Sequence, residues 1–179
     1  MMDYIKIAGY KSIKEIHLDL KPINILIGAN GSGKSNFISF FDFLNHLYET
    51  KLKEYVGRRG GEEKLLHKGS KITTSLNFEI SFNNKINGYA AEIIPGEDGM
   101  IFKKEFLIYN QNKSGNISTY RNEANIKKTD NFRAPYVKKH LESYRKYHFH
   151  DTSKNSPFNQ LSHIENDIYF LYEEGRNLA

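Results

Sequence analysis

A short glycine-rich stretch constrains this chain more than any other feature of its sequence. Residues 28–35 read GANGSGKS, which satisfies the pattern G-x-x-x-x-G-K-[ST]. The apolar run 23–27 before it predicts a central strand covered on both faces, and the Phe- and Leu-rich segment 34–49 after it predicts a core helix. A strand, a glycine loop and a helix in this order predict a phosphate-binding loop.

Each residue type in this loop suits phosphate chemistry. Glycines tolerate the positive φ angles and the close backbone approach that turn several N–H groups toward phosphate oxygens, beside the positive end of the helix dipole. We expect ATP and Mg²⁺ as cofactors, with the Lys34 ammonium between the β and γ phosphates and the Ser35 hydroxyl as a Mg²⁺ ligand. The nucleotide-binding residues expected in the loop are Gly28, Asn30, Gly31, Ser32, Gly33, Lys34 and Ser35.

Alternating apolar residues predict a largely antiparallel arrangement around this loop. Segments 4–10 and 13–20 are expected to pair, and segments 72–82, 89–94 and 101–109 to form a meander. A further hairpin is predicted through 112–120, with its turn at 113–116. Helices are expected near 62–67 and over 134–147. The predicted fold class is therefore α/β, with the meander at about 72–120.

Composition excludes several classes of protein. The 179 residues include no Cys, which excludes disulfide scaffolds, Cys-based zinc sites and thiol catalysis. No run of 18 apolar residues occurs, and the N-terminus lacks the pattern of a signal peptide. We expect a cytoplasmic protein that has no membrane partner.

The positive charge is concentrated in one segment, which we expect to be a basic helical segment at about 121–147. The formal net charge is +5, and residues 121–146 alone hold eight basic and three acidic side chains. Aromatic residues are interleaved with them, a combination that nucleic-acid grooves use. An alternative is a solvated helix whose aromatic residues lie in the core. The candidate nucleic-acid contacts are Arg121, Lys127, Lys128, Arg133, Lys138, Lys139, Arg145 and Lys146.

The string YKSIK at 10–14, the residues at 20–22 and the segment 25–38 together resemble the N-terminus of RecF/SMC-like ABC-type ATPases. The similarity is greatest to the OLD-like AAA-family ATPases of bacteria, with weaker similarity at 60–69, 147–153 and 174–179. The resemblance implies the N-terminal lobe of a P-loop NTPase head that binds ATP between two heads. It also implies work on DNA in repair or anti-phage defence. Lys11 and Ser12 match a position near the nucleotide in that family, or else form a polar turn.

Several motifs of that family are missing, so the catalytic residues are unknown. No LSGG-like string occurs, and the apolar run that ends in Glu173 and Glu174 lacks the Asp of a Walker B strand. We therefore expect residues 1–179 to be a single incomplete head, with hydrolysis requiring a C-terminal lobe and a second head. The alternative is a non-catalytic nucleotide-sensing or nucleic-acid-binding interaction module.

Three polar residues, His148, His150 and Asp151, lie close together near the end of the basic segment. They could form a weak metal site, contact the nucleotide, or simply pack at a strand end. Gln160 matches the glutamine loop of the family by residue type alone.

Overall fold

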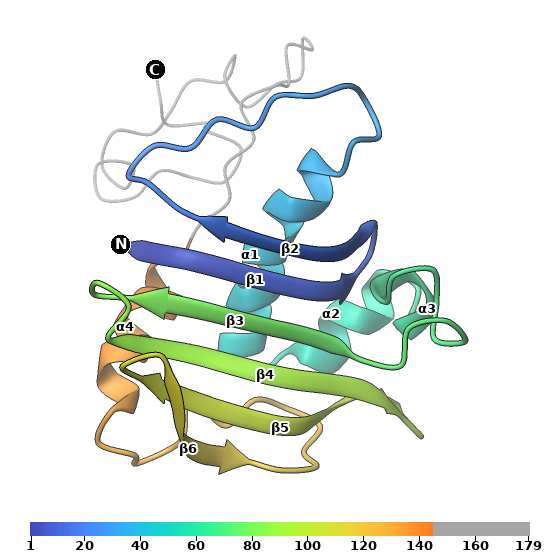
Figure 1. The fold of residues 1–179 in the computed structure, drawn as a ribbon. Helices are drawn as coiled ribbons and strands as arrows, with labels where there is room; N and C mark the ends of the chain where they lie inside the picture. Colours follow the sequence, from blue (N-terminus) through green and yellow to red (C-terminus); the bar gives the residue numbers. More distant parts are fainter. Residues whose placement is uncertain (145–179) are drawn as a thin grey trace, which may run out of the picture. The chain divides into compact units, whose positions relative to one another are not determined.

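A computed structural model describes residues 1–144, and within them all six strands belong to one antiparallel sheet (Figure 1). The sheet order is β2-β1-β3-β4-β5-β6. The strands are β1 (Met2–Tyr10), β2 (Ile13–Asp19), β3 (Leu76–Phe82), β4 (Asn87–Gly96), β5 (Gly99–Tyr109) and β6 (Asn112–Ser118). The predicted pairing of the first two strands and the predicted antiparallel meander are both confirmed.

The first strand carries the core side chains toward the helices. Ile7 faces Ile16 on β2 and Phe78 on β3, and it is fully buried. Gly9 has a φ of 78°, and a Cβ there would lie 2.4 Å from the Ser75 carbonyl oxygen, so only glycine fits this position. The change of backbone direction at Gly9 lets Tyr10 also point into the core, where it is fully buried.

The meander differs from prediction at two places. Strand β3 begins at Leu76, whereas the sequence predicted a start at residue 72. The last hairpin turns at Asn110 and Gln111, whose φ angles are 45° and 63°, and the predicted turn at 113–116 lies inside β6 and is wrong. Gly115 sits in this strand where a Cβ would approach the Asn131 amide to 3.2 Å. This glycine therefore lies inside a strand and not in a turn.

Three helices pack on one face of the sheet (Figure 1). They are α1 (Lys34–Tyr48), α2 (Leu52–Arg58) and α4 (Ala134–Ser143), and the short α3 (Glu62–Leu65) follows α2. Helix α1 buries an aromatic and aliphatic surface made of Phe37, Phe40, Phe43, Leu44 and Leu47. The predicted helices at 34–49 and 62–67 are observed within a few residues, and α2 was not predicted.

The basic segment is helical over only part of its described length. Helix α4 begins after Arg133, with Pro135 in its first turn, and residues 121–133 are irregular. The backbone of this irregular part is held by tertiary contacts, because Arg121 forms a two-way bridge with Phe102 on β5. The interpretation of 121–133 as helix is therefore wrong.

The apolar run 23–27 is not a strand, contrary to prediction. Ile23, Ile25 and Ile27 are 82%, 79% and 90% exposed. A strand requires a partner for its backbone N–H and C=O groups, and the strands of the described chain pair with one another in a single sheet that does not include this run. The predicted central strand therefore lacks its neighbours in residues 1–144.

A buried carboxylate fixes the segment that follows the sheet. Glu105 on β5 is fully buried and accepts hydrogen bonds from Tyr89 Oη at 2.7 Å, Asn125 N at 2.8 Å and Ile126 N at 2.9 Å. Burial raises the pKa of Glu105, and the donated hydrogen bonds partly oppose that rise. The Glu105 side chain thus ties residues 125–126 to strand β5.

Replacing Glu105 with Ala should destabilise the fold by about 2–4 kcal/mol, because two backbone amides and the Tyr89 hydroxyl lose their buried acceptor. Urea unfolding of the full chain measures this loss. The matched control is Glu15→Ala on β2, where the exposed side chain should matter by less than about 0.5 kcal/mol. Equal stability of the two variants would contradict the anchoring role.

Candidate functional site

The glycine loop leads directly into the N-terminus of α1, as the motif predicts. Gly31 and Gly33 have φ angles of 83° and 94°, and Gly33 is the N-cap residue. Gly28 has an ordinary φ, but a Cβ on it would lie 2.9 Å from Ser32 Oγ. The positive φ angles therefore favour glycine at positions 31 and 33, whereas the Ser32 hydroxyl near Gly28 belongs to a flexible side chain that can shift.

Lys34 folds back over the loop that precedes it. Its ammonium donates hydrogen bonds to the carbonyl oxygens of Gly28 at 2.6 Å and Ala29 at 2.7 Å, and it lies 3.3 Å from Ser32 Oγ. The positive charge is therefore held within the curve of the loop, where phosphate oxygens could take over these contacts.

The start of α1 suits an anionic ligand. No side chain of the described residues caps this helix, and its first turn contains no acidic residue. The Ser35 side chain is exposed in that turn. Uncapped N–H groups, a lysine and an accessible hydroxyl make up the donor set that a triphosphate and its Mg²⁺ require.

The turn between β1 and β2 lies against the same end of α1. Ser12 Oγ accepts a hydrogen bond from Asn36 Nδ2 at 2.7 Å, and it would lie 3.1 Å from a Cβ on Gly33. Lys11 reaches one turn further along the helix, where its ammonium donates to Ser39 Oγ at 2.8 Å. The structure thus brings Ser12 beside the loop and ties Lys11 to the body of the helix.

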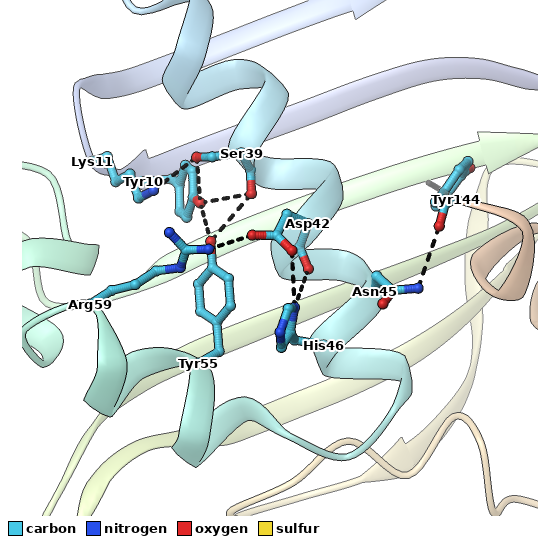
Figure 2. Close-up of polar contacts among 9 residues, drawn as sticks. All are labelled: Tyr10, Lys11, Ser39, Asp42, Asn45, His46, Tyr55, Arg59 and Tyr144. Atoms are coloured by element: carbon cyan, nitrogen blue, oxygen red, sulfur yellow. Dashed lines mark hydrogen bonds and ion pairs between the residues drawn. The ribbon is translucent and has the colours of Figure 1, made fainter. Parts of the chain in front are cut away.

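Figure 2 shows a buried hydroxyl cluster beneath this turn, formed by Tyr10, Ser39 and Tyr55. Tyr10 Oη lies 2.9 Å from Tyr55 Oη and 3.0 Å from Ser39 Oγ. Burial raises the pKa of both tyrosines, so their hydroxyls stay protonated and act as hydrogen-bonding groups. The sequence did not predict this cluster, because Tyr10 ends an apolar segment whereas Tyr55 lies in a charged one, and no local pattern links the two.

The cluster continues into an ion pair on its outer side (Figure 2). The Arg59 guanidinium stacks over the Tyr55 ring at 4.3 Å and pairs with Asp42 at 2.5 Å. Asp42 also lies 3.1 Å from His46 Nδ1. These contacts join α1 to the end of α2, and they help to hold α1, which carries the glycine loop at its N-terminus, in position.

Some of the predicted nucleic-acid residues make contacts within the protein, and others do not. Lys127 pairs with Glu49 at 2.5 Å, Arg133 lies 4.1 Å from the Tyr109 ring centre, and Lys138 donates to the Thr129 carbonyl at 3.0 Å. Arg121, Lys128 and Lys139 are exposed and form no ion pair with the described residues.

Arg145, Lys146, His148, His150, Asp151, Gln160, Glu173 and Glu174 lie outside the described residues. Within residues 1–144, no three His, Asp or Glu side chains come together as a metal site. No helix in that part of the chain combines the length and the apolar character needed to cross a bilayer.

A comparison with protein-family models matches most of the chain. A family model described as "AAA domain, putative AbiEii toxin, Type IV TA system" matches residues 23–176. This match confirms the predicted similarity to AAA-family ATPases. The six-stranded sheet and its helices confirm the predicted α/β class.

Two further similarities are partial. The chain is 37% identical over 86 residues to Urease accessory protein 2 of Cryptococcus neoformans var. grubii serotype A, a match that covers 45% of this chain and 7% of that protein. It also resembles a chain of a solved structure described as "Structural biochemistry of ATP-driven dimerization and DNA stimulated activation of SMC ATPases", with a TM-score of 0.45 and 22% identity. That similarity covers 64% of this chain and 72% of the other. The match to the curated relative thus covers only a small part of that protein's length.

Replacing Gly33 with Ala tests the loop geometry. The strained φ should destabilise the fold by about 1–2 kcal/mol. Gly57→Ala is the matched control, because Gly57 lies in α2 and a Cβ there would enter open space. This substitution should stabilise the fold by about 0.5–1 kcal/mol. Urea unfolding should show these opposite signs, and a stabilising Gly33→Ala change would refute the loop conformation.

Proposed function

Because the chain belongs to the AAA domain family whose model matches residues 23–176, we propose that it is the N-terminal lobe of an ATPase head that binds Mg-ATP through residues 28–35. The observation that carries this proposal is the position of the Lys34 ammonium. It is held by the loop carbonyls at the uncapped start of α1.

In the proposed complex, the loop amides and the end of α1 receive the phosphates. Lys34 exchanges its carbonyl contacts for phosphate oxygens, and the exposed Ser35 hydroxyl is available to the metal. Bound Mg²⁺ would neutralise part of the phosphate charge. Ser12 supports the loop from the side through Asn36, and Lys11 lies one helical turn away on Ser39.

Hydrolysis in this proposal needs a second lobe, which packs on the apolar surface around residues 23–27. This surface borders an open hollow of about 550 Å³ that Leu26, Phe37, Ile38 and Phe41 help to line. Exposed apolar residues on this scale are typical of a surface that another protein element covers. The missing neighbours of the predicted strand 23–27 would then come from that lobe.

A second head completes the proposed ATPase, and its biological setting is DNA repair or anti-phage defence in the cytoplasm. Support for this setting comes from the family resemblance of residues 10–38 and from the basic segment after the sheet. The second candidate function is a nucleotide-sensing interaction module without hydrolysis. The uncapped start of α1 supports nucleotide binding in either function. Measuring ATP turnover by the assembled heads distinguishes the ATPase from the sensing module.

Changing Lys34 to Ala should weaken binding of Mg-ATP about 10- to 150-fold, because the charge-assisted hydrogen bonds to the phosphates are lost. Calorimetric titration of the full chain measures this change. Lys14→Ala removes the same charge from the exposed surface of β2 and should leave affinity unchanged. Unaltered affinity in the Lys34 variant would refute the phosphate-loop assignment.

Changing Ile27 to Asp tests whether the apolar surface is free in this chain. Since the side chain is 90% exposed, the free energy of unfolding should change by less than about 0.5 kcal/mol, and binding of a hydrophobic dye should fall. Ile7→Asp, at a buried position of β1, should unfold the protein. If the Ile27 variant is destabilised by more than about 2 kcal/mol, the run is already covered and no second lobe is needed there.

A further inference from the structure

The irregular segment between β6 and α4 forms an open hollow of about 370 Å³, lined by residues 120–125 and Lys128. It lies on the part of the chain that follows the meander, apart from the glycine loop in the sequence. Its walls carry two cations and an exposed aromatic ring, so its chemistry differs from that of the apolar hollow beside residues 23–27.

The backbone of this hollow is fixed by hydrogen bonds at several points. Arg121 N donates to Phe102 O at 3.1 Å, and Arg121 O accepts from Phe102 N at 2.7 Å. The Glu105 carboxylate holds the amides of Asn125 and Ile126, and Asn125 Nδ2 donates to Ile117 O at 2.7 Å. The hollow is therefore pre-organised, which reduces the entropy lost when a ligand binds.

The cations of the hollow are available to a ligand. Arg121 and Lys128 are exposed, and neither side chain forms an ion pair within the described part of the protein. The one acidic wall residue, Glu123, is already engaged, because its carboxylate accepts the amides of Leu52 at 2.7 Å and Lys53 at 3.0 Å at the start of α2. The hollow therefore presents net positive charge.

Tyr120 adds a flat surface at the edge of these charges. Its side chain is 65% exposed, and its φ of 50° is rare for an aromatic residue. The bridge between Arg121 and Phe102 holds the adjacent backbone in place, so a fixed bend after β6 presents the ring to solvent. An exposed ring next to cations suits a base and its phosphates.

We propose that this hollow binds single-stranded nucleic acid, with Arg121 and Lys128 contacting successive phosphates and Tyr120 stacking on a base. The inference deepens the proposed action on DNA and rests on it. In this proposal, only some cations of the basic segment bind the ligand. Lys127, Arg133 and Lys138 make contacts within the protein instead.

Fluorescence anisotropy of the full chain with a labelled 12-nucleotide oligothymidine, titrated at several salt concentrations, tests the proposal. Arg121→Ala and Lys128→Ala should each lower the slope of log affinity against log salt by about 0.7. Tyr120→Ala should weaken binding about 5- to 100-fold with an unchanged slope. Lys138→Ala and Lys14→Ala are the charge-matched controls and should keep affinity and slope near those of the parent chain.

Three outcomes would overturn the proposal: no binding at low salt, equal losses in the hollow variants and the controls, or duplex DNA bound as tightly with no effect of Tyr120→Ala. ATP titration of the same samples keeps the two proposals separate. If the parent chain binds ATP but not the oligonucleotide, only the nucleic-acid proposal for the hollow is refuted. If the parent chain does not bind ATP, the phosphate-loop assignment is refuted.

Discussion

The packing of α1 against the sheet determines the geometry of everything near the glycine loop. Phe40 lies 5.1 Å from the ring centre of Tyr10 and 5.6 Å from that of Phe78, and Phe43 lies 5.5 Å from Tyr55. Such aromatic contacts add directional stabilisation to the burial of large apolar surfaces. Because the loop is the N-terminal extension of this helix, its orientation depends on contacts made one and two turns away.

The buried hydroxyl cluster adds directional hydrogen bonds to this apolar packing. Ser39 Oγ accepts from the Lys11 ammonium and donates to Asn36 O at 2.8 Å, and it lies 3.0 Å from Tyr10 Oη. A single helical residue thus connects the turn between β1 and β2 with the first turn of α1. A ligand that drew Lys11 toward the loop would have to break its hydrogen bond to Ser39, so the two positions are energetically coupled.

Local sequence patterns predicted the parts of this fold that depend on local physics. The glycine loop was predictable because positive φ angles at Gly31 and Gly33 require glycine. The β1–β2 pair was predictable because alternation places alternate side chains in the core. Helix α2 was missed because its N-terminus is capped by Glu123, about 70 residues later, a partner that no local window contains. The turn at Asn110 and Gln111 was missed because Gly115 gave the stronger turn signal.

The same distinction applies to the apolar run 23–27 and to the basic segment. An apolar run predicts that a segment will be covered, but not which chain covers it, and 23–27 lacks a paired neighbour in residues 1–144. Charge composition likewise predicts a basic segment without saying which cations are used internally. Lys127 and Lys128 are adjacent in sequence, yet one pairs with Glu49 and the other lines an open hollow. The direction of each side chain from an irregular backbone decides whether the cation pairs within the protein or faces solvent. The buried carboxylate of Glu105, 20 positions before Asn125, holds that backbone in place.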